Sequence, residues 1–134
     1  MADKIKIEIV TPDAMVVSDE VDEITVSGTE GEFGVLPGHC HMLSSLKIGA
    51  VNYKKDNAVQ YMALGGGYAE VGPDKVTILA ETAELADKID AERAKAALAR
   101  AESELKSLTA DDKKYAEVEE SLEKAMIRLE VAGK

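Results

Sequence analysis

Tryptophan is absent from this chain, and cysteine and phenylalanine each occur only once among its 134 residues. A single cysteine excludes an internal disulfide framework and is typical of a protein that resides in a reducing compartment. No apolar run approaches the roughly 20 residues that span a bilayer. The segment "MADKIKIEIV" at the start of the sequence alternates like a strand and does not resemble a signal peptide. We therefore expect a cytosolic protein that does not insert into the membrane.

Basic residues are also scarce, with 16 Lys and Arg against 26 Asp and Glu, which gives a net charge of -10 at pH 7. Nucleic-acid binding depends on clustered Lys and Arg, and here no basic run is longer than two residues. The same deficit disfavours binding to anionic membrane surfaces. With 46% hydrophobic residues, however, the chain can bury a sizeable core. These features predict a globular protein without a nucleic-acid partner.

The distribution of glycine and proline changes near residue 80. All three prolines and every glycine except Gly133 precede that point. Short segments in this part alternate with period two, as in "IKIEIV", where Ile5, Ile7 and Ile9 share one face. Turn residues separate these segments at regular intervals. This part of the sequence predicts an all-β sandwich or barrel.

The pattern after residue 80 is helical. Apolar residues recur at spacings of three and four at Ala91, Ala94, Leu98, Ala101, Leu105 and Leu108, and again at Tyr115, Val118, Leu122, Ala125, Leu129 and Ala132. Such spacing places them on one face of each of two helices. Thr109, followed three residues later by Asp112, resembles a capping box and predicts that the second helix starts near Ala110.

The predicted fold class is therefore α+β. A β-sandwich or barrel in residues 1–82 precedes an antiparallel two-helix hairpin in residues 83–134, because a short loop joins the two helices. Alanine dominates the apolar face of the first helix. A seam of small residues lets helices approach closely but buries little area, so we expect a hairpin that is ordered but weakly held.

The segment "GEFGVLPGHCHML", residues 31–43, holds both histidines and the cysteine. His39 and His41 would face the same side of a strand, but no other His or Cys exists to complete a zinc site. A nucleophilic role for Cys40 is disfavoured because neighbouring side chains on a strand diverge, so we expect a buried or half-buried cysteine in a strand. The sequence therefore indicates no metal site and no catalytic residue here.

Three consecutive glycines, Gly65 to Gly67, suggest a phosphate-binding loop at first sight. Such a loop must open a helix whose N–H groups face the phosphate, whereas here the strand-like "YAEV" follows. The glycines are more typical of a bend, a bulge or the close approach of another backbone.

A family resemblance extends over essentially the whole chain, and three longer segments carry it: "SGTEGEFGVLPGH" (27–39), "ALGGGYAEVGPDKVTILAETAE" (63–84) and "KIDAERAKAALARAESEL" (88–105). In this order and spacing they resemble the epsilon-subunit family of bacterial F-type ATP synthases. The resemblance implies a non-catalytic rotor subunit at the cytoplasmic face of the bacterial inner membrane, within the F1 sector. It implies a sandwich that binds the gamma subunit and the polar loops of the c-ring. It also implies a mobile hairpin that extends along gamma to the catalytic alpha/beta hexamer and inhibits ATP hydrolysis.

The resemblance also assigns rotor contacts. It implies that Glu32 lies near the c-ring loops and that His39 and Ser44 lie at the gamma interface. Phe33 replaces the aliphatic residue that is usual in the family, and "HCHML" replaces a more apolar run that contains proline. Turn geometry and core packing are the alternative roles for these residues.

Some members of the family bind ATP on the folded hairpin, and the resemblance implies a similar site here, with no other cofactor required. The residues that match are Glu84, Ile89, Asp90, Arg93, Ala94, Arg100, Lys124 and Arg128. Arg93 and Arg100 are seven apart, so they share a helix face and can bind phosphates. Lys124 stands where stronger binders have Arg, which removes one bidentate contact.

Two alternatives stay open for these residues. In one, Asp90 only caps a helix while the arginines pair with Glu92 and Glu104 on a solvated surface. In the other, the chain is a free-standing soluble ATP sensor that uses the hairpin as its site and the sandwich as a scaffold.

Overall fold

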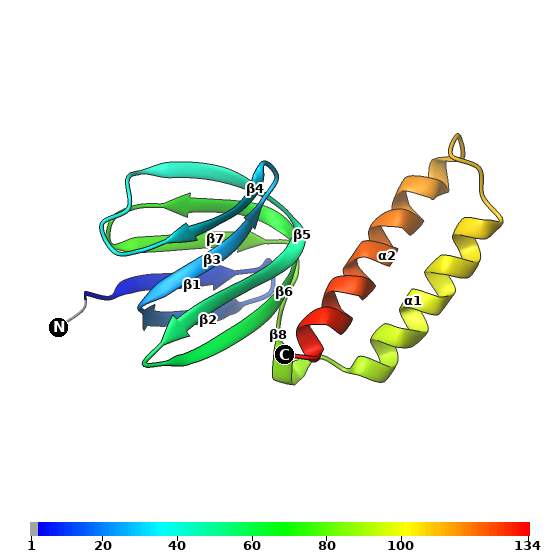
Figure 1. The fold of residues 1–134 in the computed structure, drawn as a ribbon. Helices are drawn as coiled ribbons and strands as arrows, with labels where there is room; N and C mark the ends of the chain where they lie inside the picture. The colour runs from blue at the N-terminus through cyan, green and yellow to red at the C-terminus, as the bar shows by residue number, and fades with distance from the viewer. Residues whose placement is uncertain (1–2) are drawn as a thin grey trace.

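The computed structural model describes residues 3–134 and contains a β-sandwich followed by two antiparallel helices (Figure 1). The elements are β1 (Ile5–Val10), β2 (Met15–Val21), β3 (Glu23–Gly28), β4 (Gly31–Val35), β5 (Met42–Lys55), β6 (Ala58–Val71), β7 (Lys75–Ala80), β8 (Ala83–Leu85), the 3-10 turn η1 (Ala86–Lys88), α1 (Ala91–Lys106) and α2 (Lys113–Ala132). The α+β class and the order of its two parts are confirmed.

The strands follow the order β2-β1-β7-β6-β5-β3-β4, and β8 pairs with β6. All pairings are antiparallel except that of β1 with β7, in which Lys6 lies opposite Lys75. The two longest strands, β5 and β6, form one hairpin with a tight turn at Asp56 and Asn57. Both turn residues have positive φ, 49° and 72°, as a type I′ turn requires. This long hairpin forms the surface on which helix α2 packs.

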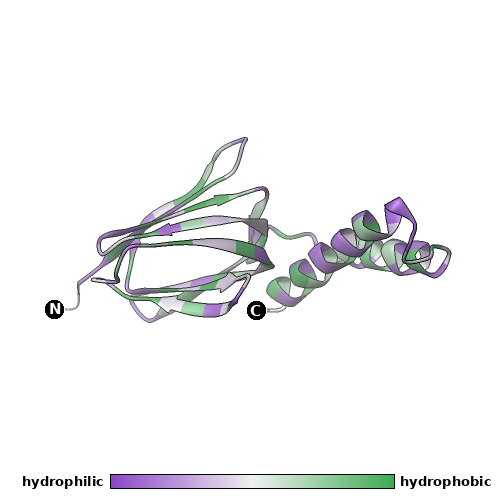
Figure 2. Ribbon diagram, turned by 90° about the horizontal axis from the view of Figure 1, so that it is seen from above, coloured by the Kyte–Doolittle hydropathy of each residue, from purple (hydrophilic) through white to green (hydrophobic). Residues whose placement is uncertain are grey.

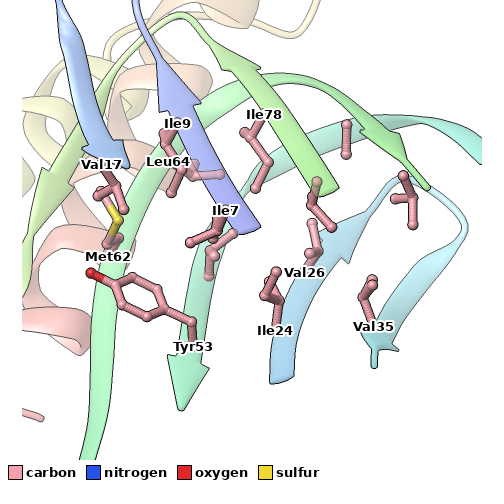
Figure 3. Close-up of a cluster of buried hydrophobic side chains, with 14 of the residues drawn as sticks. Ile7, Ile9, Val17, Ile24, Val26, Val35, Tyr53, Met62, Leu64 and Ile78 are labelled. Atoms are coloured by element: carbon pink, nitrogen blue, oxygen red, sulfur yellow. The ribbon is translucent and has the colours of Figure 1, made fainter. Parts of the chain in front are cut away.

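Alternation along the strands builds the core of the sandwich. Ile5, Ile7 and Ile9 of β1 are fully buried, as the period-two pattern predicts, and Val76 and Ile78 of β7 are buried beside them. Figure 3 shows Ile7, Ile9 and Ile78 in one cluster of buried side chains with those of other strands, among them Val26 of β3. A fully buried aliphatic side chain of this size stabilises the fold by about 1.5–3 kcal/mol relative to an exposed one.

The three glycines of β6 allow this strand to exchange partners. Met62 to Leu64 pair with β8, whereas Gly67 to Val71 pair with β7. Gly66 and Gly67 have φ of 100° and 150°, and a Cβ atom on Gly67 would overlap the carbonyl oxygen of Leu79. The predicted bend with close approach of another backbone is confirmed.

The helical hairpin has the predicted seam. Of the predicted positions, Ala94 and Ala101 of α1 and Val118 and Ala125 of α2 are buried. Val131 of α2, which the spacing does not include, is buried as well. Helix α1 ends at Lys106, so Leu108 lies in the loop rather than on the helix. Figure 2 shows both helices as a mixture of hydrophilic and hydrophobic residues, as expected for helices with one buried face.

The predicted start of the second helix is wrong. The N-cap of α2 is Asp112, whose carboxylate accepts a hydrogen bond from Lys114 N at 2.9 Å. Thr109 instead closes the preceding turn, because its carbonyl accepts from Asp112 N at 3.0 Å. Aspartate is at least as good an N-cap as threonine, so the later of two adjacent signals sets the start of the helix.

The two helices differ in their relation to the sandwich. Helix α2 packs against β5, β6 and η1, whereas the packing partner of α1 is α2 (Figure 1). Neither helix combines the length and apolar character needed to cross a membrane. The hairpin is therefore a second layer that is attached to the sandwich through one of its two helices.

Candidate functional site

A pocket of about 160 Å³ lies where α2 meets the sandwich. Its lining residues come from β6, from the link between β7 and β8, from β8 and from α2: Ala63, Leu64, Gly65, Thr82, Glu84, Lys124, Ile127 and Arg128. The glycine bend makes this possible, because Gly65 N donates to the carbonyl of Thr82 at 2.9 Å and holds β8 against β6. The pocket brings together three residues of the predicted nucleotide site, namely Glu84, Lys124 and Arg128.

Glu84 and Arg128 form a two-point ion pair across this junction. Arg128 Nε lies 2.8 Å from Glu84 Oε1, and Arg128 Nη2 donates to Glu84 Oε2 at 3.2 Å. The two side chains keep 25% and 35% exposure, so the pair is partly shielded from water. The Arg128 guanidinium, a member of the predicted nucleotide site, is therefore already paired with a carboxylate of the same chain.

Lys124 has an acidic partner as well. Its ammonium group lies 3.3 Å from Glu120 one turn earlier on α2, in the spacing that favours ion pairs on a helix. The pocket thus contains two cationic groups whose charges are balanced by Glu84 and Glu120. An anionic ligand entering it would have to exchange places with at least one carboxylate.

The remaining predicted nucleotide residues lie on or just before α1 and do not line this pocket. Asp90 is the N-cap of α1 and accepts from Arg93 N at 3.1 Å, which is one of the two roles open to it. The side chains of Arg93 and Arg100 are exposed, while Ala94 is buried in the helix seam and Ile89 is half-buried. Glu92 pairs with Lys95, at 3.6 Å, rather than with an arginine.

The predicted rotor residues occupy the strands and the turn around residues 31–45. Glu32 is exposed on β4, and Phe33 is half-buried opposite Val26. His39 lies in the turn, where its Nδ1 is 2.7 Å from the carbonyl oxygen of Cys40. Ser44, on β5, donates from Oγ to the carbonyl of Ser45 at 3.0 Å.

Cys40 is exposed and lies outside any strand, so the expectation of a buried or half-buried strand cysteine is wrong. The backbone stays in a turn because Gly38 adopts φ 86° and donates to the carbonyl of Pro73 at 2.8 Å. His39 N also donates to the carbonyl of Leu36, at 3.1 Å. Strand β5 therefore begins only at Met42.

An exposed apolar surface was missed in the sequence. Leu43, Tyr68 and Leu79 project from adjacent strands with exposures of 72%, 59% and 55%, and Tyr68 lies opposite Leu79. Exposed apolar side chains gathered in this way are typical of protein interaction surfaces. One signal was available, since "TILA" continues apolar through Leu79 where a one-sided strand would alternate.

Comparison with known proteins places both parts of the chain in one family. Residues 4–86 match the family model described as ATP synthase, Delta/Epsilon chain, beta-sandwich domain. Residues 87–133 match the model described as ATP synthase, Delta/Epsilon chain, long alpha-helix domain.

Curated relatives match over the whole chain. An ATP synthase epsilon chain from Citrifermentans bemidjiense is 60% identical over 134 residues, which cover 100% of this chain and 97% of the relative. An ATP synthase epsilon chain from Geotalea daltonii is 58% identical over the same shares.

Among solved structures, a chain of the Euglena gracilis mitochondrial ATP synthase, described as OSCP/F1/c-ring in rotational state 1, has a TM-score of 0.82. It is 28% identical, and the match covers 98% of this chain and 82% of that one. A chain from the central stalk/c-ring structure of the Tetrahymena thermophila mitochondrial ATP synthase has a TM-score of 0.63 over 96% of each chain. Its identity is 12%, so this second match shows the fold alone.

Proposed function

This chain belongs to the delta/epsilon chain family of ATP synthases, and from that premise we propose that it is a non-catalytic rotor subunit that regulates ATP hydrolysis through its helical hairpin. The observation that carries the proposal is the division of the molecule into a strongly packed sandwich and a weakly seamed hairpin, in the order of the two family models. In the bacterial cell the subunit would lie at the cytoplasmic face of the inner membrane as part of F1.

The sandwich is the proposed rotor-binding part. The apolar surface of Leu43, Tyr68 and Leu79 offers the kind of area that a stable protein partner covers. Ser44 follows Leu43 directly, and His39 lies in the turn that precedes β5. We assign this region to the gamma subunit and the exposed Glu32, with Phe33 beside it on β4, to the polar loops of the c-ring.

The hairpin is the proposed inhibitory part. Its seam is made largely of alanine, so the difference in free energy between the packed and the extended hairpin is small enough for partners to change it. In the extended form the exposed seam would need a new surface, which gamma and the catalytic alpha/beta hexamer provide. Extension of the hairpin is then the step that inhibits ATP hydrolysis.

Removal of residues 87–134 from the subunit in the assembled enzyme tests this role. We expect coupled ATP synthesis to continue and ATP hydrolysis to rise, because the sandwich retains all of its strands. Unchanged hydrolysis would contradict the inhibitory role. Failure of the shortened subunit to assemble would contradict the assignment of rotor binding to the sandwich.

ATP is the proposed regulatory ligand of the hairpin, and the convergence of two cationic groups of the predicted site, Lys124 and Arg128, on one pocket supports this. Titration calorimetry of the full chain with ATP, with and without Mg²⁺, tests this. We expect binding that Arg93→Ala weakens, whereas absence of binding at millimolar ATP would contradict a nucleotide site. A free-standing ATP sensor would bind equally well but would leave hydrolysis by the assembled enzyme unaffected.

A further inference from the structure

The hairpin is attached to the sandwich in an unexpected way. Helix α1 follows the sandwich directly in the chain, yet α2 makes the packing contacts with β5, β6 and η1 (Figure 1). The hairpin is therefore closed, meaning packed on the sandwich, only while α2 keeps its contacts with β5, β6 and η1.

Few apolar contacts are available at this interface. Ile127 reaches both the pocket beside Ala63 and a shallow groove beside Ile48, and Val131 is fully buried. Met126, which directly precedes Ile127, is 53% exposed. Two cationic contacts add to these, namely Glu84 with Arg128 and the Lys134 ammonium 5.5 Å from the centroid of the Tyr61 ring. Among the described residues, Glu84 with Arg128 is the one carboxylate–cation pair that joins α2 to the sandwich.

The two residues of the ion pair lie on opposite sides of the junction between α2 and the sandwich. Glu84 belongs to β8, where it lies opposite Ala63 of β6, and its neighbours Ala83 and Leu85 pack against the sandwich core. Arg128 belongs to α2. Between them in the chain, η1 contains no buried residue, so the backbone can pivot after Leu85 without exposing core. Opening of the hairpin at this pivot must separate Glu84 from Arg128.

We propose that the Glu84–Arg128 ion pair is a latch that holds α2 on the sandwich, and that Glu84 competes with phosphate groups for the Arg128 guanidinium. This proposal rests on the function proposed above and names the regulation of its hairpin. A partly shielded ion pair contributes more than a fully solvated one, and removal of one partner leaves a half-buried charge without its counter-ion.

Competition follows from the geometry of the pair. Glu84 occupies the edge of the guanidinium formed by Nε and Nη2, so a phosphate can bind that edge only after the carboxylate moves away. Two anions at one guanidinium would repel each other. Loss of the negative charge at Glu84 should therefore weaken closure and strengthen phosphate binding at the same time, which a purely structural role of Glu84 would not do.

The latch can be tested in the full-length isolated chain by energy transfer between two dyes. Cys40 is exposed on the sandwich and takes one dye, and Glu119→Cys on the exposed face of α2 takes the other. We expect Glu84→Gln and Arg128→Gln each to lower the ratio of closed to open hairpin by about tenfold. The exchanged pair, Glu84→Arg with Arg128→Glu, should recover most of that loss.

A matched control is available on the same helix. Glu120→Gln removes the ion pair with Lys124, which lies within α2 and does not cross the junction, and it should change the ratio by less than about twofold. Urea unfolding monitored on the sandwich verifies that each variant is folded. An unchanged ratio in Glu84→Gln, or an exchanged pair that behaves like the single variants, would overturn the latch.

Binding of inorganic triphosphate, measured by calorimetry, tests the competition. We expect Glu84→Gln to bind it several-fold more tightly than the unmodified chain, and equal or weaker binding would overturn this part of the proposal. In the assembled enzyme, Glu84→Gln should lower ATP hydrolysis because it favours the extended hairpin, whereas truncation at residue 86 should raise it. The opposite signs separate failure of the latch from failure of the inhibitory role.

Discussion

The sandwich and the hairpin bury very different side chains. The sandwich encloses five fully buried isoleucines, Ile5, Ile7, Ile9, Ile24 and Ile78. The predicted seam of the hairpin buries three alanines and one valine: Ala94, Ala101, Ala125 and Val118. Each buried methylene-sized group contributes about 0.8 kcal/mol, so a helix of regular geometry can still be weakly held. The helical hairpin is therefore the less stable part of the molecule, and the sandwich is the more stable part.

The largest expected effect comes from the core of the sandwich. Ile78→Ala removes a fully buried side chain from the centre of that core and should lower the free energy of unfolding by about 2–5 kcal/mol. Urea denaturation monitored on the sandwich measures the loss. Val118→Ala in the hairpin should leave this transition in place and increase only the rate of amide exchange in α1 and α2. A single transition shifted equally by both would show that the two parts unfold together.

The glycine bend of β6 gives the next effect. Gly67→Ala places a Cβ against the Leu79 carbonyl in a backbone conformation that L residues rarely adopt, and we expect a loss of about 1–3 kcal/mol. Gly34→Ala is the control, because the nearest atom to its Cβ lies 3.9 Å away. Thermal unfolding of the two variants compares them. Equal stabilities would mean that β6 can exchange partners without glycine.

A smaller effect is expected in the hairpin, at the start of α2. Asp112→Ala removes the N-cap and should cost about 1 kcal/mol of helix stability. Thr109→Ala, at the position predicted from the sequence, should cost less than half as much. Amide exchange in the first turn of α2 distinguishes the two. A larger effect at Thr109 would support the capping box that the sequence predicts at Thr109 and Asp112.

The smallest effect is a dependence on pH that belongs to the sandwich. Hydrogen bonds from Lys75, Lys55 and Lys4 lower the pKa values of Glu8, Asp19 and Asp22, respectively. Folded pKa values below the unfolded ones mean that this stabilisation is present above about pH 4 and is lost as the pH falls through the folded values.

The difference in stability between about pH 6 and about pH 3 is measured from the urea midpoints at the two pH values. This difference should be smaller in Asp22→Asn and in high salt. Asp22 and Asp56 both accept from Lys4 at 2.8 Å, so this group joins the start of the chain to two turns. A difference that Asp22→Asn leaves unchanged would assign the pH dependence to other carboxylates.

Periodicity in the sequence predicted the two-part fold, because burial on one face imposes period two on strands and spacings of three and four on helices. Local signals gave a wrong start for α2, because two possible N-caps, Thr109 and Asp112, lie close together. They also gave a wrong start for β5, because a long-range hydrogen bond from Gly38 N to the carbonyl of Pro73 holds the preceding turn. The site was predictable only as a set of residues. Nothing in the spacing of Glu84 and Arg128 indicates that they meet, since their contact depends on how α2 lies on β6.

The parallel pairing of β1 with β7 has a consequence for synthesis of the chain. Ile7 finds its neighbour Val76 only after almost the whole sandwich has been made, so the first strand waits through translation with one edge unpaired. Pairings this distant in sequence form slowly, in milliseconds to seconds, whereas a helix forms within about a microsecond. The helices, translated after the sandwich, and the β5–β6 hairpin on which α2 packs both depend on contacts close in sequence, so the slow step belongs to the opposite part of the sandwich.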